Sequence, residues 1–254
     1  MEIAIVTGAS SGMGKEFAKK LDEKNFDELW LIALNEENLN KVKQELKTKC
    51  RIFALDLTKA ESFCVISTAL EEIKPDVKWL VNASGFGKFG RYDQVSISDS
   101  LNMIDLNCKA LVHLTELALP YMHENAKIAQ FGSIAGFQPV PYINVYSATK
   151  AFVVSYSRAL NMELKPRKIS VTCICPYWTK TQFFNRAVNP QNNVVKKYVV
   201  MYDAEKVVNK AFKDVEKGKE LSTYGFKAIS QRRLVKILPH KLVMKIWLTQ
   251  QKLK

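Results

Sequence analysis

Hydrophobic and polar positions along the chain form two alternating patterns. Short, mostly apolar runs predict strands at residues 2–6, 28–33, 51–55, 78–82, 126–131 and 169–175, and residues 219–223 are a further, weaker candidate. Longer amphipathic stretches predict helices at residues 13–24, 36–48, 59–74, 99–124, 146–165 and 203–217. Strands that are apolar on both faces are typical of a parallel sheet that helices cover on both sides. The predicted fold is therefore α/β, a doubly wound, mostly parallel seven-stranded sheet with helices on both faces.

The chain has two parts of different character. Nothing before about residue 225 has the composition of a linker, so residues 1–225 are predicted to form a single domain. Residues 226–254 are predicted to form a basic amphipathic tail. Residues 221–254 contain eight Lys and Arg residues and no Asp or Glu. After Pro239, the apolar face of a predicted helix contains Leu242, Val243, Ile246 and Trp247.

The tail leaves three interpretations open. A basic amphipathic helix favours peripheral contact with a membrane surface. The same segment could dock on the domain, or it could form an oligomer interface. No apolar stretch is long enough to span a bilayer, and no signal peptide precedes the first strand, so we expect a cytoplasmic protein.

The net charge of +13 raises the question of nucleic-acid binding. The sequence has no zinc-finger spacing, no RNP-like strand and no basic helix that carries base-reading Asn or Gln beside Arg. We therefore expect a lysine-rich solvated surface and no nucleic-acid partner. The five cysteines are odd in number, and four lie in apolar segments, which favours reduced thiols and no metal site.

The first predicted strand leads through a glycine-rich turn into a helix. The turn reads Thr7-Gly8-Ala9-Ser10-Ser11-Gly12-Met13-Gly14. Gly8 permits a tight turn, Gly12 lets the backbone approach a ligand, and Gly14 lets the helix pack closely on the strand. The free N–H groups and the positive dipole end of such a helix attract a diphosphate. A purely structural turn is the alternative.

A second group of chemically active residues follows the fifth predicted strand. Ser133 lies in a Gly-Ser-Ile-Ala-Gly segment, and Tyr146 follows it by thirteen residues. On a helix, Tyr146 and Lys150 lie on one face, at positions i and i+4. A neighbouring ammonium lowers the pKa of a phenol, which is ordinarily about 10. A phenol tuned in this way can exchange a proton with a carbonyl or alcohol oxygen.

Together these spacings resemble the short-chain dehydrogenase/reductase family. The turn has the pattern T-G-x-x-x-G-x-G, and Tyr146 and Lys150 match the family's Y-x-x-x-K motif. The resemblance implies a Rossmann-like fold and hydride transfer between a nicotinamide cofactor and a carbonyl/alcohol pair. It implies that Tyr146 is the acid/base, and that Lys150 binds the nicotinamide ribose and lowers the tyrosine pKa. Ser133 would orient the substrate oxygen, and Asn107 would help to anchor a water relay. From the residues alone, Asn107 is a polar kink in helix 99–124.

The resemblance covers residues 1–223 and implies further cofactor ligands after the other strands. Asp56 and Leu57 match the segment that contacts adenine, and Pro176 and Thr181 match the segment near the carboxamide. The chain departs from the family pattern at Ala83, Ser84 and Tyr177, the last of which replaces a glycine. The predicted cofactor-binding residues are Gly8, Ser10, Ser11, Gly12, Met13, Gly14, Asn35, Asp56, Leu57, Asn82, Ala83, Ser84, Tyr146, Lys150, Pro176 and Thr181.

The choice between NAD and NADP is expected to depend on the end of the second strand. An acid there binds the ribose 2′-hydroxyl of NAD, whereas an arginine accommodates the 2′-phosphate of NADP. Ala33 and Leu34 supply neither, and Glu36 is expected to begin the next helix. Because the acid is missing, NADP(H) is favoured over NAD(H). Side chains that could hydrogen-bond a phosphate are Ser10, Ser11 and Asn35, with Lys15 nearby.

Aromatic residues surround the predicted site. Residues 182–202 lie where the family has a lid, and closing lids exclude water. This segment contains Phe183, Phe184, Tyr198 and Tyr202. The other motifs are flanked by Phe86, Phe89, Phe137, Tyr142, Tyr177 and Trp178. An apolar pocket suits an apolar ligand, so we expect a hydrophobic 3-oxoacyl, steroid-like or aromatic ketone. Ordinary core packing of these rings is the alternative.

The leading interpretation is an NAD(P)-dependent oxidoreductase that acts on a small-molecule carbonyl or alcohol. The alternative is a non-catalytic protein on the same fold, which senses a nicotinamide cofactor or acts as a scaffold at a membrane surface. The family resemblance implies a homodimer or homotetramer, formed through the helices that contain Asn107 and Tyr146.

Overall fold

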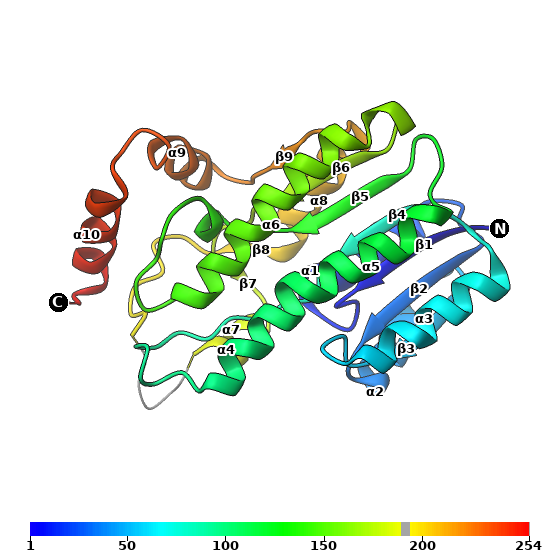
Figure 1. Ribbon diagram of the computed structural model, residues 1–254, viewed down its shortest axis with the longest axis horizontal. Coiled ribbons are helices and arrows are strands. Elements are labelled where there is room, and N and C mark those ends of the chain that lie inside the picture. The colour runs from blue at the N-terminus through cyan, green and yellow to red at the C-terminus, as the bar shows by residue number, and fades with distance from the viewer. Residues whose placement is uncertain (189–193, 254) are drawn as a thin grey trace.

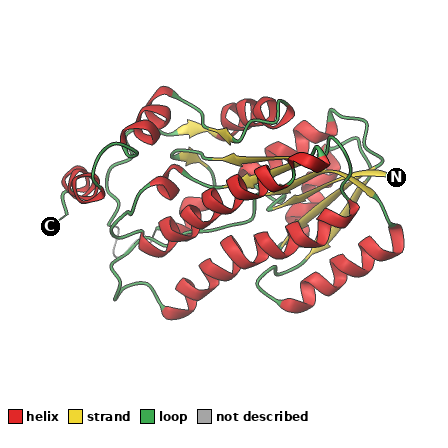
Figure 2. Ribbon diagram, turned by 45° about the horizontal axis from the view of Figure 1, so that its top comes forward, coloured by secondary structure: helices red, strands yellow, loops and turns green. Residues whose placement is uncertain are grey.

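The structure is a computed structural model that describes residues 1–188 and 194–253. Its centre is a seven-stranded sheet with the strand order β3-β2-β1-β4-β5-β6-β9, in which every neighbouring pair is parallel. The predicted α/β architecture is confirmed, with a sheet that is parallel throughout (Figures 1 and 2). The strands are β1 (Glu2–Thr7), β2 (Glu28–Ala33), β3 (Cys50–Ala54), β4 (Asp76–Asn82), β5 (Lys127–Phe131), β6 (Ser170–Ile174) and β9 (Leu221–Ser222).

Helices cover both faces of the sheet because its strands are apolar on both sides. Ile3 and Ile5 of β1 belong to one core cluster, whereas Ala4 and Val6 face the other. The first cluster includes apolar residues of α3 (Ala60–Ile73), α5 (Ala110–Ala118) and α6 (Asn144–Glu163). The second includes residues of α1 (Gly12–Asp22), α2 (Glu36–Glu45) and α8 (Ala204–Glu216).

The order of the strands determines where a ligand can bind. β1 lies between β2 and β4. The chain adds β2 and β3 on one side of β1, and then returns to add β4, β5, β6 and β9 on the other side. Thr7 pairs with Ile32 on one side and with Asn82 on the other, which aligns the three carboxyl ends. In doubly wound sheets the ligand crevice opens beyond the carboxyl ends at such a switch point.

The prediction of one continuous helix over residues 99–124 is wrong. The segment is divided into α4 (Ile97–Ile104), a π-helical turn (Asp105–Lys109), α5, and a 3₁₀ turn (Leu119–Tyr121). Asn107 lies in the π-helical turn and is almost fully buried. Hydrogen bonds from its side chain to the backbone of Phe86 and to Thr149 accompany the local change of helix.

Segments without a strong sequence pattern complete the carboxyl end of the sheet. β7 (Thr179–Lys180) and β8 (Tyr202–Asp203) pair in parallel and were not predicted. The short helix α7 (Phe183–Ala187) lies in the predicted lid, of which residues 189–193 fall outside the described part. Two further 3₁₀ turns occur at Ile134–Phe137 and Lys165–Arg167.

The tail forms two helices, α9 (Phe226–Leu234) and α10 (His240–Gln251), beyond the carboxyl ends of the strands (Figure 1). Trp247 is buried and donates from Nε1 to the carbonyl of Pro141 at 2.9 Å. The buried Gln251 side chain accepts from the backbone N–H groups of Lys196 and Lys197, at 2.9 Å each. One side of the tail is therefore packed on the domain. No helix in the described ranges is both long enough and apolar enough to span a membrane.

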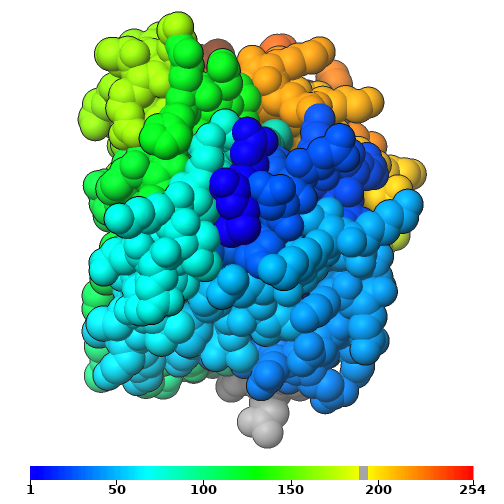
Figure 3. Space-filling view, turned by 90° about the vertical axis from the view of Figure 1, so that its right-hand side faces the viewer, coloured from blue at the N-terminus to red at the C-terminus, as the bar shows by residue number. Residues whose placement is uncertain are grey.

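The N-terminus lies at the end of the molecule opposite to the tail. Figure 3 views that end and shows the first residues, in dark blue, at the surface between neighbouring segments. The backbone carbonyls of Met1 and Glu2 accept hydrogen bonds from Asp76 and Asp27, both at 2.9 Å. These bonds fix the start of β1 at the amino-terminal edge of the sheet, so the carboxyl-terminal edge is left for a ligand.

A close approach between the turn at Ile134–Phe137 and α6 sets the relative position of Ser133 and Tyr146. A Cβ atom on Gly136 would lie 2.5 Å from the carbonyl oxygen of Lys150. We expect Gly136→Ala to lower the free energy of unfolding by about 1–3 kcal/mol, because overpacking against backbone cannot be relieved by a side-chain rotation.

Urea denaturation would measure this loss. Gly90→Ala is the matched control, because its added Cβ would meet side chains and no backbone, with Val95 at 3.1 Å and Gln94 at 3.5 Å, and a smaller effect is expected. Equal denaturation midpoints for the two variants would contradict the prediction.

Candidate active site

The glycine turn after β1 has the geometry of a phosphate-binding turn. Gly8 and Gly12 adopt φ values of +64° and +54°, which strain any other residue. A Cβ on Gly14 would lie 2.3 Å from the carbonyl oxygen of Gly8, so only glycine lets α1 approach the turn this closely. The first turn of α1 contains no acidic residue, and the Ser11 side chain makes no capping hydrogen bond. The positive end of the helix is therefore open to an anion.

A cleft of about 550 Å³ extends from this turn across the carboxyl ends of the strands. The predicted cofactor ligands that line it are Gly8, Ser10, Ser11, Gly12, Met13, Gly14, Asn35, Asp56, Leu57, Ala83, Ser84, Tyr146, Lys150, Pro176 and Thr181. Asn82 does not line it. Its buried side chain instead donates from Nδ2 to Thr115 and Gln130, at 3.1 and 3.0 Å. Asn82 thus connects β4 to β5 and α5 beneath the cleft.

The end of the cleft beside β2 contains few charged groups. Asn35 caps α2, since its Oδ1 accepts from the Asn38 N–H at 2.7 Å, and its Nδ2 remains a donor. Glu36 begins α2, as predicted. The Lys15 ammonium lies 2.6 Å from Glu45 Oε1, and Lys15 does not line the cleft. The lysine that the sequence placed near a phosphate is therefore paired with an acid.

Tyr146 and Lys150 both line the cleft, and Ser133 lies beside Tyr146 outside the cleft wall. The Lys150 amine lies 5.8 Å from the centre of the Tyr146 ring and donates to the Phe131 carbonyl at 2.6 Å. Ser133 Oγ accepts from the Ala135 N–H at 3.1 Å, which leaves its hydroxyl proton for another acceptor. The side chains of residues 146 and 150 thus lie on one side of α6, as their spacing predicts.

Asn107 lies behind this group. Its Oδ1 accepts from the Phe86 N–H at 3.0 Å, and its Nδ2 donates to the Phe86 carbonyl and to Thr149 Oγ1, at 2.9 and 3.0 Å. A Cβ on Gly85 would lie 2.9 Å from Asn107 Oδ1 and 3.4 Å from Lys150 Nζ, so the two side chains approach each other there. The amide therefore fixes the loop after β4 against α6.

Burial has the largest effect on the pKa values of Tyr146 and Lys150. It raises the pKa of Tyr146 to about 12, although a hydrogen bond with Ser133 acts in the opposite direction. Burial also lowers the pKa of Lys150 to about 8. Desolvation is thus the largest influence on both groups, and a lowering of the phenol pKa by the Lys150 ammonium stays a prediction.

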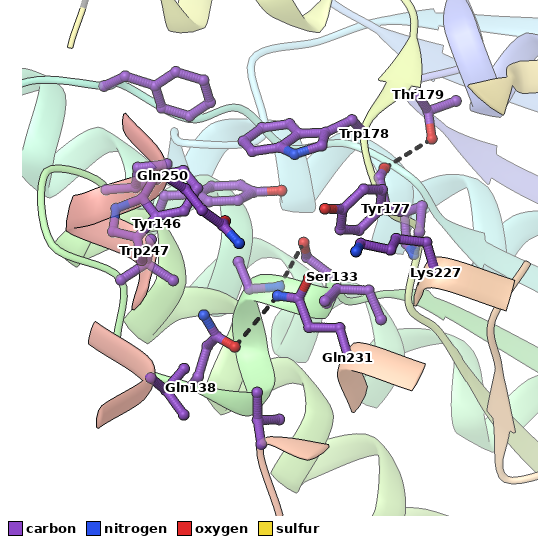
Figure 4. A pocket seen from close by; sticks show the side chains of 18 of the residues that line it. Ser133, Gln138, Tyr146, Tyr177, Trp178, Thr179, Lys227, Gln231, Trp247 and Gln250 are labelled. Atoms are coloured by element: carbon purple, nitrogen blue, oxygen red, sulfur yellow. Dashed lines mark hydrogen bonds between the residues drawn. The ribbon is translucent and has the colours of Figure 1, made fainter. Parts of the chain in front are cut away.

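A second cavity, of about 280 Å³, adjoins the cleft on the side of the C-terminal helices. Figure 4 shows Tyr146, Ser133, Tyr177, Trp178 and Trp247 around it. Tyr146 lines both this cavity and the cofactor cleft. Of the predicted aromatic residues, those that line the cavity are Phe89, Tyr177, Trp178, Phe183 and Phe184.

The other predicted aromatic residues have different places. Phe86 lines the cleft, and Tyr198 packs edge-on against Trp178 with ring centres 5.1 Å apart. The cavity wall does not include Phe137, Tyr142, Tyr198 or Tyr202. Core packing therefore accounts for part of the aromatic pattern.

Two features of the site were missed by the sequence analysis. The guanidinium of Arg186, on α7, stacks on the Phe86 ring at 3.3 Å and lines the cleft. Its place within the aromatic lid segment was the available signal. The second is the cavity wall formed by α9 and α10, which includes Val243 and Trp247. The amphipathic face of the tail indicated a docking surface, but nothing in its pattern indicated what the surface would enclose.

Comparison with known proteins agrees with this geometry. The sequence profile of the short chain dehydrogenase family matches residues 2–192. The chain is 33% identical over 188 residues to sulfoacetaldehyde reductase 2 of Chromohalobacter salexigens, covering 72% of this chain and 74% of that protein. It is 31% identical over 191 residues to the very-long-chain 3-oxoacyl-CoA reductase of Bos taurus, covering 71% of this chain and 60% of that protein.

Solved structures have the same fold. A short-chain dehydrogenase from Sphingobium yanoikuyae in complex with NADPH superimposes with a TM-score of 0.78 at 24% identity, over 94% of this chain and 97% of that one. One from Burkholderia phymatum in complex with NAD gives 0.80 at 21% identity, over 92% of each chain. The chain belongs to the short-chain dehydrogenase family and is an NAD(P)-dependent oxidoreductase.

Proposed function

We propose that this oxidoreductase reduces the carbonyl of a hydrophobic substrate, with Tyr146 as the proton donor. The observation that carries the proposal is the position of Tyr146, which borders both the cofactor cleft and the apolar cavity. A substrate in the cavity and a dinucleotide in the cleft would meet at this phenol. The bound nicotinamide supplies or accepts the hydride.

The protonated form of Tyr146 suits the role of proton donor. A phenol with a pKa of about 12 is neutral at physiological pH and can donate a proton to a developing alkoxide. The hydroxyl of Ser133, which faces the phenol oxygen, would turn its proton to the carbonyl oxygen of a bound substrate and orient it. The Lys150 ammonium has two protons left after its bond to Phe131, and these suit the hydroxyls of the nicotinamide ribose.

We propose that Asn107 positions a water relay and the loop after β4. Its two N–H donors and one lone pair of Oδ1 bind protein atoms, so a second lone pair of Oδ1 remains for a water relay toward Lys150. The buried amide would hold Gly85 and Phe86 against α6, and thereby fix one wall of the cofactor cleft.

A hydrophobic ketone is the substrate class that the cavity supports. Seven aromatic side chains of the described residues line it, and Val243 and Ile246 of α10 add aliphatic surface. Curated relatives at 31–32% identity include very-long-chain 3-oxoacyl-CoA reductases, which is consistent with an oxoacyl, steroid-like or aromatic ketone. Apolar pockets with few polar groups recognise such ligands by burial of their hydrocarbon.

We propose NADP(H) as the preferred cofactor. Ala33 and Leu34 stand where an acidic residue would bind the ribose 2′-hydroxyl of NAD, and neither has a carboxylate. Arg186 adds positive charge to the cleft, and no carboxylate of the described residues lies within ion-pair distance of it. We assign it to a phosphate group of the dinucleotide, as a lid residue that closes over the cofactor.

A homo-oligomer through α4 and α6 is also proposed. These helices carry exposed apolar residues on the side away from the sheet, which a second copy could cover. They are Ile97, Leu101, Ile104 and Phe152. Such an interface would support the helices that hold Asn107 and Tyr146.

The test of the function is a panel of apolar ketones, assayed with NADPH and NADH separately by absorbance of the reduced nicotinamide. Tyr146→Phe should lower kcat about 10²- to 10⁴-fold, the range expected for loss of an acid/base group, and retain cofactor binding measured by fluorescence. Tyr92→Phe changes an exposed phenol and serves as the control. Unchanged turnover in Tyr146→Phe would contradict the proposal and favour the non-catalytic alternative.

The buried lysine predicts a pH-dependent effect on stability. Its pKa falls from 10.5 to about 8 in the folded protein, so the unfolded chain binds more protons between these values. Stability from this group therefore rises with pH across that window, and the buried charge costs stability below it. We expect Lys150→Met to raise the free energy of unfolding by about 1–3 kcal/mol at neutral pH, and to lose that advantage near pH 10.

Urea denaturation of both proteins at the two pH values would measure this difference. Lys236→Met, at an exposed position, is the control and should have no pH-dependent effect. A difference between Lys150→Met and the parent chain that stays constant with pH would show that the buried charge is not its origin.

The exposed side of the tail supports a second proposal, peripheral binding to an anionic membrane by a cytoplasmic protein. Phe226 and Ile237 are 86% and 81% exposed, and Leu234 and Ile246 are also exposed. The same segment contains eight basic residues and no acid. Exposed apolar side chains together with positive charge are the features that bind an anionic lipid surface.

Flotation with vesicles that contain anionic lipid tests this contact. The chain should float with anionic vesicles, less with neutral ones, and a Phe226→Glu/Ile237→Glu variant should remain at the bottom of the gradient. Tyr92→Glu, at a position 85% exposed and elsewhere on the domain, should float like the parent chain. Equal flotation of all three proteins would reject a membrane role for the tail.

A further inference from the structure

The cavity beside Tyr146 has one charged residue in its described wall. Lys227 is that residue, and the other polar groups are amides, hydroxyls and the ring nitrogen of tryptophan. Lys227 lies in the first turn of α9 and is exposed at the mouth of the cavity. Figure 4 shows its side chain directed into the cavity.

Lys227 has no acidic neighbour to neutralise it. No carboxylate in the described ranges lies within ion-pair distance of its amine, and the segment 221–254 contains no acid at all. Many other lysines of the protein are paired, such as Lys24 with Glu216 at 2.5 Å. An ammonium without a partner at the mouth of an apolar cavity attracts an anion from solution.

The residues of α9 and of the turn after it that line the cavity change from polar to apolar along the chain. Lys227, Ser230 and Gln231 come first, then Leu234 at the end of α9, and Val235 and Leu238 follow in the turn. Gln231 Nε2 donates to Gln138 Oε1 at 3.3 Å, so the polar end of this wall also meets the amide of Gln138. The cavity is therefore polar and positive at one end of this wall and apolar toward α10.

We propose that the substrate is an oxo acid with an apolar body, and that Lys227 recognises its carboxylate. This rests on the proposed carbonyl reduction at Tyr146. The carboxylate pairs with the Lys227 ammonium at the polar end, while the hydrocarbon lies against α10. The charge fixes which end of the substrate enters first, and so selects the carbonyl that reaches Tyr146. Lys227 is thus a specificity-determining residue.

Matched substrates separate charge recognition from catalysis. An apolar oxo acid and its methyl ester share the carbonyl and the hydrocarbon and differ in charge. The parent protein should have a lower KM for the acid than for the ester, and this preference should weaken as salt is added. Lys227→Met should raise the KM for the acid about tenfold, and far less for the ester, with kcat changed little.

Two further variants complete the test. Lys227→Glu should reverse the order of the two substrates, because it places a like charge at the mouth of the cavity. Lys236→Met removes an exposed lysine that does not line the cavity and should leave both KM values unchanged. A Lys227→Met variant that affects acid and ester equally, or neither, would overturn the assignment. Failure of the parent protein to reduce either compound would count against the proposed function itself.

Discussion

The site depends on one buried ammonium. Lys150 is enclosed by the sheet and α6, where its charge is costly, and the hydrogen bond to the Phe131 carbonyl compensates only part of that cost. This bond ties α6 to the last residue of β5, which places Tyr146 at the carboxyl edge of the sheet. The Lys150 side chain in turn occupies the space that Gly85 leaves open beside Asn107. We expect the buried charge to lower the stability of the folded protein at this position, an exchange of stability for activity that is common in active sites.

Much of the fold could be predicted because most of its strands and helices have a clear local pattern of apolar and polar residues. The apolar runs of the first six strands and the glycine turn after β1 report directly on burial and on backbone conformation. The irregular elements could not be predicted in this way. The π-helical turn at Asn107 depends on hydrogen bonds to Phe86 and Thr149, which are far from it in the sequence. The two-residue strands β7 and β8 are too short to show a periodicity.

The sequence predicted which side chains of the site lie near one another, and predicted less well how burial changes their pKa values. Spacing brought Tyr146 and Lys150 to one side of a helix, but the burial of both groups, which raises one pKa and lowers the other, comes from tertiary packing. Tertiary packing also determined the place of Lys15, which the sequence analysis had put near the cofactor. Its position in the sequence suggested a phosphate ligand, and its pairing with Glu45 across α1 and α2 removed it from the cleft. Arg186 contributes a cation there instead.

The division of the cavity wall has an evolutionary consequence. The glycine turn, Ser133, Tyr146 and Lys150 all lie within the segment that matches the family profile, whereas α9 and α10 lie beyond it. Part of the wall of the proposed substrate cavity is therefore encoded beyond the stretch that encodes the proposed hydride chemistry. Under the proposed function, substitutions in α9 and α10 would change which substrates fit while leaving the dinucleotide cleft as it is, so we expect paralogues with different substrates to differ in these helices.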